Sequence, residues 1–270
     1  MQGTLYCRTE CLELALLEVL TRARPTPHRA GTAPHRIPLG LLLLSRQQLT
    51  AAQLRTALEA QRAAGHGSNQ NTIQKTMKIG AWLQELGFAT EQQVTAALAR
   101  QWSCPVLRSG PAAMGASRLP AIFPGIPVPL LESFQMIPVE LVEATKTLLI
   151  AFSEGIDYSV LYAIEQMLGY HTEACLVCPS TLQKGLRALA RQRGASDVVF
   201  ERMEDAGECA HIIGNYSAKV KAREVRLARC GDHLWIRLER LRQEAVTMVL
   251  HTSSEKLTVP SRGQFGESRV

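Results

Sequence analysis

Three features that mark common classes of protein are missing from this sequence of 270 residues. No Gly-x-x-x-x-Gly-Lys-Ser/Thr occurs, so the chain lacks the loop that cradles nucleotide phosphates in many hydrolases, and no other catalytic constellation is found. No apolar run approaches the ~20 residues that a membrane-spanning helix needs. Aromatic residues make up only 5%, which argues against a stacking platform for single-stranded nucleic acid. We therefore expect a non-enzymatic protein without a membrane span.

Cysteine is present, but not with the regular spacing of a disulfide scaffold. Seven cysteines are an odd number in a chain long enough to build its own core, which favours a reducing compartment and a cytoplasmic location. Cys175 and Cys178 form one Cys-x-x-Cys pair, but a structural zinc site needs four ligands. Cys209 and His211 could complete such a set, although nothing in the spacing requires it. We interpret the pair as a strand residue and its neighbour at the strand exit, and expect no metal site.

The sequence contains an internal repeat, in which residues 79–101 resemble residues 39–61, and each copy predicts a helix, a turn and a second helix. Glycine, threonine and glutamine occupy matching places: Gly40 and Gly80, Thr50 and Thr90, Gln61 and Gln101. Each threonine precedes a glutamine by three residues, which is the spacing of a helix capping box. Each copy then carries a helical apolar stripe whose last member is Gln61 or Gln101.

A glutamine on an apolar seam needs a partner, since an unpaired buried amide costs about 1–3 kcal/mol. Two interpretations stay open for Gln61 and Gln101. Either each amide caps the end of a neighbouring helix, or both point at a polar ligand between the two copies.

The rest of the chain predicts an α+β fold, with two domains and a smaller third piece. Apolar runs predict strands at 136–139, 147–152 and 171–177, and helices at 160–168 and 180–193, the second opened by a capping box from Ser180 to Gln183. A helix over 206–221 and a β-hairpin around Gly231 follow. The predicted division is an N-terminal helix and flexible lead-in at 1–36, a duplicated helical module at 37–108, an α+β sandwich at 130–193, a helix plus β-hairpin at 195–250 and a disordered tail at 251–270. Residues 62–77 are expected to form a mobile loop, and residues 109–129 a connector.

The doubled pattern resembles the N-terminal domain of the ATPases of type II secretion and type IV pilus assembly, the GspE/MshE type. In that family a doubled Arg-Leu-Gly…Gly…Leu…Gln motif forms a helical module that precedes a small α/β unit. The motif is matched here by Leu39-Gly40 to Gln61 and by Lys78-Ile79-Gly80 to Gln101, and the resemblance covers residues 37–192. The chain departs from the motif at Pro38 and Lys78, which stand where the family has arginine, and at Gln47, where it prefers glycine.

The resemblance implies a ligand, because several members of the family bind cyclic di-GMP on the doubled motif. It implies that the glycine backbone approaches the ligand, that a cation meets guanine or phosphate and that the glutamines form hydrogen bonds. By position, the candidate site residues are Leu39, Gly40, Leu43, Gln61, Arg62, Lys78, Ile79, Gly80, Leu83 and Gln101. Arg36 also lies close to the first motif in the sequence.

Two functions from different classes follow. The first is a regulatory or assembly protein of a secretion or pilus system, which acts by protein contacts, uses no cofactor, and either senses cyclic di-GMP or keeps the module for protein contacts alone. The second is nucleic-acid binding through the basic residues of the last third, where acidic residues are interleaved. These basic residues are Lys219, Lys221, Arg223, Arg226, Arg229, Arg237, Arg240 and Arg242.

Overall fold

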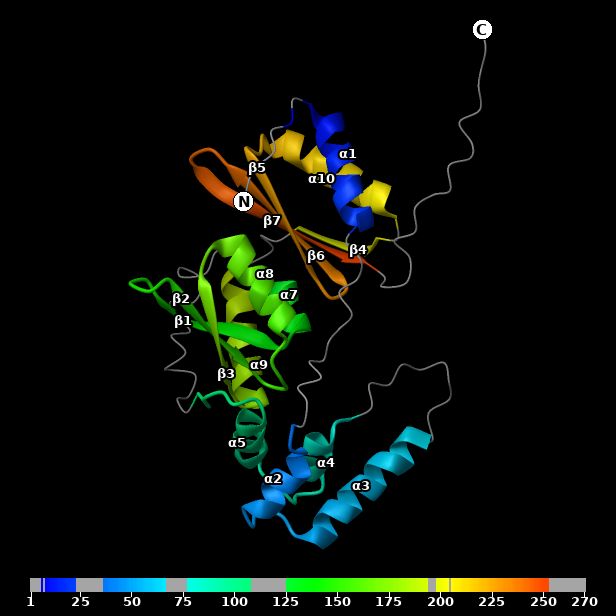
Figure 1. Cartoon of the computed structure of the whole chain (residues 1–270), viewed down its shortest axis with the longest axis vertical. Coiled ribbons are helices and arrows are strands. Elements are labelled where there is room, and N and C mark those ends of the chain that lie inside the picture. Colours follow the sequence, from blue (N-terminus) through cyan, green and yellow to red (C-terminus); the bar gives the residue numbers. More distant parts are fainter. Residues whose placement is uncertain are drawn as a thin grey trace.

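The computed structural model describes residues 6, 8–22, 36–66, 77–107, 125–193, 198–203 and 205–252 (Figure 1). Helices and two small sheets alternate along this part of the chain, so the predicted mixture of helix and strand is confirmed. The expected lead-in at 24–35 and the expected loop at 67–76 lie outside the described residues, as do the connector at 109–124 and the tail at 253–270. No helix in the described ranges has the length and the apolar character that crossing a membrane requires.

Residues 39–101 form four helices. The first copy supplies α2 (Leu39–Ser45) and α3 (Ala51–His66), and the second supplies α4 (Ile79–Glu85) and α5 (Glu91–Gln101). Helix α3 continues to residue 66, so the predicted loop between the copies begins later than residue 62. The copies pack crosswise, with α2 against α5, α3 against α4 and α2 against α4.

Both predicted capping boxes are present in this helical module. The backbone N–H of Thr50 donates to Gln53 Oε1 at 2.9 Å, and that of Thr90 donates to Gln93 Oε1 at 2.8 Å. In return, the N–H of each glutamine donates to the threonine hydroxyl at 3.3 and 3.2 Å. The two bonds satisfy donors that a helix start leaves unpaired, which explains why the second helix of each copy begins at this place.

The first sheet has the strand order β1-β2-β3. Strand β1 (Met136–Val142) runs antiparallel to β2 (Thr147–Phe152), and β2 runs parallel to β3 (His171–Leu176). Helix α8 (Tyr158–Leu168) makes the crossover from β2 to β3. Its start is capped by Asp157, which accepts from the N–H of Ser159, and its end is Gly169 at φ 74°. The short helix α7 (Val128–Ser133) precedes β1, and it runs from the end of the expected connector into the expected sandwich.

Helix α9 (Pro179–Arg193) follows β3, but the predicted capping box at its start is wrong. The backbone N–H and the hydroxyl of Ser180 both donate to the carboxylate of Glu91, at 2.6 and 2.7 Å. Gln183 instead donates to Gln135 Oε1 at 2.9 Å. A carboxylate from α5 is a stronger acceptor than a neutral side chain, so the helical module itself caps α9.

The last third contains the predicted helix, α10 (Ala206–Val220), but its sheet has four strands where the sequence predicted only the hairpin at residues 195–250. Its order is β4-β7-β6-β5, built from β4 (Val198–Met203), β5 (Glu224–Cys230), β6 (His233–Arg240) and β7 (Gln243–Thr252). The predicted hairpin is β5 and β6, with Gly231 at φ 56° in the turn. Strand β7 extends past residue 251, where the tail was expected to begin.

The N-terminal helix belongs to this second sheet. Helix α1 (Thr9–Arg22) lies beside α10 (Ala206–Val220), and both helices cover the second sheet (Figure 1). Leu16 and Leu20 of α1 are buried in the same apolar cluster as Ile213 of α10 and Ile236 of β6. The expected separate N-terminal unit is therefore part of the core of the last third.

Candidate functional site

Each motif glycine lies where the first helix of its copy packs closely against the second, and Gly80 also faces the other copy. A Cβ atom on Gly40 would lie 2.6 Å from Leu54 Cδ1, and one on Gly80 would lie 3.0 Å from Val94 Cγ1. The same Cβ on Gly80 would lie 3.2 Å from Leu39 Cδ2, which comes from the other copy. Both glycines are buried, so in this structure they allow helices to approach each other.

The two glutamines bond to the backbone of the opposite copy. Gln61 Nε2 donates to the carbonyl oxygen of Met77 at 2.8 Å, and Gln101 Nε2 donates to that of Ile37 at 2.8 Å. Each acceptor lies two residues before the first helix of the other copy. Of the two interpretations left open by the sequence, this geometry agrees with glutamines that bond to neighbouring helix ends. The arrangement is reciprocal, so one pair of side chains ties the two copies together.

Lys78, the cation of the second motif, forms an ion pair with a residue outside the helical module. Lys78 Nζ lies 2.7 Å from Glu154 Oε2, at the end of β2, and this ion pair is largely solvent-exposed. Pro38 brings no charge to the first motif. Close to it, the guanidinium carbon of Arg36 lies 3.3 Å from the centre of the Trp102 ring. Arg62 is exposed at the surface of α3.

The apolar residues proposed as ligand walls are mostly core. Leu43 and Leu83 have no exposed surface, and Leu39 is 7% exposed. Together with Val94 and other side chains they form the apolar cluster that holds the four helices together. Ile79 is half-buried at the edge of this cluster. The residues with accessible polar surface are therefore the two glutamines and the neighbouring cations.

Solved structures similar to this chain include proteins of the kind that the doubled motif resembles. One is a structure of MshE with cdg (cyclic di-GMP), with 26% identity and a TM-score of 0.40, over 56% of this chain and 98% of that chain. Two structures of the N-terminal domain of XpsE have 15% and 19% identity, with TM-scores of 0.35 and 0.30. They cover 56% and 54% of this chain, and 92% and 90% of their own.

No family model matches the sequence, and no curated protein does. With TM-scores below 0.5, the solved structures are likenesses only, and the function of this chain has to be argued from its own residues.

Of the Cys-x-x-Cys pair, Cys175 lies in β3 and Cys178 lies two residues beyond the end of this strand. Among the residues that the structure describes, no group of three or more metal-ligating side chains comes together. Cys175 is buried, and this burial, with a smaller contribution from Cys104 nearby, raises the pKa of its thiol to about 12. Cys178 accepts a weak hydrogen bond from the Thr95 hydroxyl at 3.6 Å.

The basic residues of the last third are partly neutralised. Arg226 Nε lies 2.8 Å from the carboxylate of Glu224, and Arg237 also pairs with an acidic neighbour, Glu239. Arg240 donates to the carbonyl oxygen of Glu244 at 2.8 Å. Three of the eight basic residues are therefore held by contacts with neighbouring residues, which leaves them less available to a phosphate backbone.

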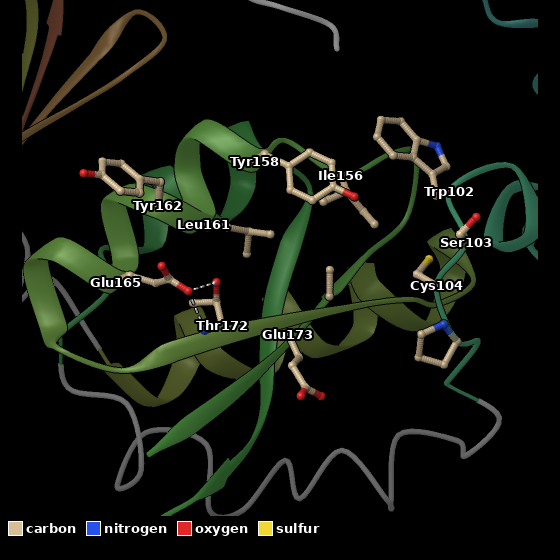
Figure 2. A pocket seen from close by; sticks show the side chains of 12 residues that line it. Trp102, Ser103, Cys104, Ile156, Tyr158, Leu161, Tyr162, Glu165, Thr172 and Glu173 are labelled. Atoms are coloured by element: carbon tan, nitrogen blue, oxygen red, sulfur yellow. Dashed lines mark hydrogen bonds between the residues drawn. The ribbon is translucent and has the colours of Figure 1, made fainter. Parts of the chain in front are cut away.

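A feature that the sequence did not point to is a cavity of about 460 Å³ beside β3 (Figure 2). Tyr158 and Tyr162 reach it from α8, Trp102 and Cys104 from the end of α5, and Ala174 from the strand. The two tyrosines are 58% and 63% exposed. Their spacing of four residues, on an otherwise apolar helix, is the signal that could have revealed it.

Proposed function

We propose that this chain is a non-enzymatic regulatory or assembly protein of a secretion or pilus system, which acts through protein contacts in the cytoplasm. The resemblance of the doubled motif to secretion-ATPase N-terminal domains supports the choice of system. The lack of a phosphate-cradling loop and of any other catalytic constellation in the sequence supports a non-catalytic role.

The observation that carries the proposal is the reciprocal bonding of Gln61 and Gln101. Each amide nitrogen donates one hydrogen bond to the other copy, and both glycines lie against packed side chains, so the two copies hold each other in place. A preorganised body of this kind can present fixed surfaces to a partner without an ordering cost.

Cyclic di-GMP is the candidate ligand of the module, and to bind it Lys78 would have to leave its ion pair with Glu154. An anionic dinucleotide needs cations, but Pro38 has none and Lys78 is paired with Glu154. A lysine also lacks the planar fork with which arginine bonds phosphate or guanine bidentately. We therefore propose that the native module serves protein contacts and has lost tight binding of the dinucleotide.

Calorimetry with cyclic di-GMP tests this division of roles on three proteins. The wild type is compared with the variant Pro38→Arg with Lys78→Arg, which restores both arginines, and with Gln61→Ala plus Gln101→Ala. We expect no saturable heat from the wild type at micromolar ligand. The restored variant should gain affinity by about tenfold or more, since the two bidentate arginines together should contribute at least about 1.4 kcal/mol.

The opposite result has an equally definite meaning. Saturable heat from the wild type at micromolar ligand, lost in the double alanine variant, would make the chain a dinucleotide sensor. If the variant with both arginines also gave no binding heat, the arginines alone would not be enough to make a site for cyclic di-GMP between the copies.

A further inference from the structure

Strand β3 is an edge of the first sheet, and its outward backbone groups are paired at both ends of the strand. On the inner side, His171 N–H donates to the Lys146 carbonyl and Val177 N–H to the Phe152 carbonyl, both at 2.9 Å. The backbone N–H and C=O of the even-numbered residues point away from β2, because these groups alternate in direction along a strand. Thr172 N–H accordingly donates outward, to Glu165 Oε1 at 2.8 Å (Figure 2).

At its other end, the chain itself adds a strand residue to this edge. Val106 forms a parallel bridge with Leu176. Leu176 N–H donates to the Pro105 carbonyl at 2.9 Å, and Leu107 N–H donates to the Leu176 carbonyl at 2.7 Å. This short pairing shows that the edge of β3 accepts an extended segment lying beside it.

Ala174 lies midway between these two paired positions and has the same outward direction as Thr172 and Leu176. No hydrogen-bond partner for its N–H or C=O is recorded among the described residues. The residue is half-buried and lines the cavity of about 460 Å³. A backbone donor and acceptor therefore face a hollow, in a place where an added strand would use both.

The two faces of this edge differ in character. On the side of α8, Tyr158, Leu161 and Tyr162 offer ring and apolar surface, with Trp102 at the far end (Figure 2). On the opposite side of the strand, the carboxylate of Glu173 points away from α8 and is exposed (Figure 2). The residues that line the cavity include two glutamates and no lysine, arginine or histidine, although the whole chain carries a net charge of +6.

We propose that β3 binds a short, extended, basic peptide segment of a partner protein as an added strand. The N–H and C=O of Ala174 form the backbone hydrogen bonds. Because side chains of an added strand alternate between the two faces, its apolar residues lie against Tyr158 and Tyr162 and its basic residues lie toward Glu173. The inference rests on the proposed protein-contact role and names a surface and a partner chemistry for it.

A nuclear magnetic resonance titration of the full chain tests the proposal with a capped Val-Lys-Val-Lys-Val peptide as the probe. We expect the Ala174 amide signal to shift and its hydrogen exchange to slow on saturation. The same peptide with N-methylated backbone amides keeps its charge but loses donors, so it should bind about fivefold more weakly or worse.

Two variants at one position separate the backbone bond from the side chain. Ala174→Pro removes the outward N–H, a change that edge strands tolerate, and should weaken the peptide about fivefold. Ala174→Val keeps the N–H and is the matched control. It should bind the peptide as the wild type does.

Reversal of charge at the exposed Glu173 gives a test that does not depend on the fold of the proline variant. Glu173→Lys should lose the preference for Val-Lys-Val-Lys-Val and gain one for Val-Glu-Val-Glu-Val. Binding that survives both Ala174→Pro and the charge reversal, or no shift at Ala174 with saturating peptide, would overturn the proposal. Calorimetry with cyclic di-GMP probes residues of the helical module instead, so the two proposals fail independently.

Discussion

At the scale of single residues, the matching turns of the two copies have a positive φ at the same place, but a different residue type occupies it in each copy. The turn between α2 and α3 places Gln47 at φ 57°, and the turn between α4 and α5 places Gly87 at φ 69°. Both angles are left-handed, a conformation that glycine adopts freely and other residues adopt at a cost. The family preference for glycine at position 47 thus has a local physical reason, and the first copy carries strain that the second does not.

Gln47→Gly should relieve that strain and raise the local stability of the helical module by about 1 kcal/mol. Hydrogen exchange of the α2 and α3 amides measures the change. Arg46→Gly is the matched control, since Arg46 sits at φ −97°, where glycine only adds flexibility to the unfolded chain. If both variants lowered stability alike, the left-handed angle would not be the source of strain.

At the scale of elements, the helical module and the sandwich are joined by polar contacts from single side chains and by Ala99 of α5, which is buried in the core of the first sheet. Glu91, in the first turn of α5, accepts two hydrogen bonds from Ser180 at the start of α9. Lys78, just before α4, pairs with Glu154 after β2. The exposed ion pair contributes little, whereas the carboxylate that caps a helix start combines charge with two directed bonds.

Glu91→Ala should weaken the start of α9 and its attachment to α5, at a cost of about 1–2 kcal/mol. Faster hydrogen exchange in the first turn of α9 would report the loss. Glu91→Gln keeps one acceptor oxygen in the same place and should lose less. Equal effects of the two substitutions would mean that the bonds to Ser180 contribute nothing.

At the scale of the whole molecule, the two ends of the described chain form one core. Leu20 of α1 is 2% exposed and packs with side chains of α10 and the second sheet. That sheet in turn contributes Trp235 and Val249 to the core of the first sheet. The helical module has its own apolar cluster and reaches the core of the first sheet through Ala99 of α5, so a defect in α1 should act on the last third first.

Leu20→Ala should therefore destabilise the second sheet by about 2–4 kcal/mol, as a cavity in a packed core does. Leu14→Ala on the same helix is the control, because Leu14 is 68% exposed. Exchange should quicken in α10 and β4–β7 for the first variant only. Equal quickening in α2–α5 would contradict a separate core for the helical module.

Local signals in the sequence predicted the elements of the first two thirds. The threonine–glutamine pairs located two helix starts, because a capping box acts within a few residues of itself. The doubled spacing predicted helix pairs, and the structure brings them into contact.

What only the tertiary structure decided are pairings between residues far apart in the chain. Strand β7 lies between β4 and β6, Glu91 caps α9, and Gln61 and Gln101 bond to the backbone of the opposite copy. The open edge at Ala174 depends on which neighbours β3 has. Periodicity and capping patterns encode the element that a residue joins, whereas its partners depend on three-dimensional packing of the whole chain.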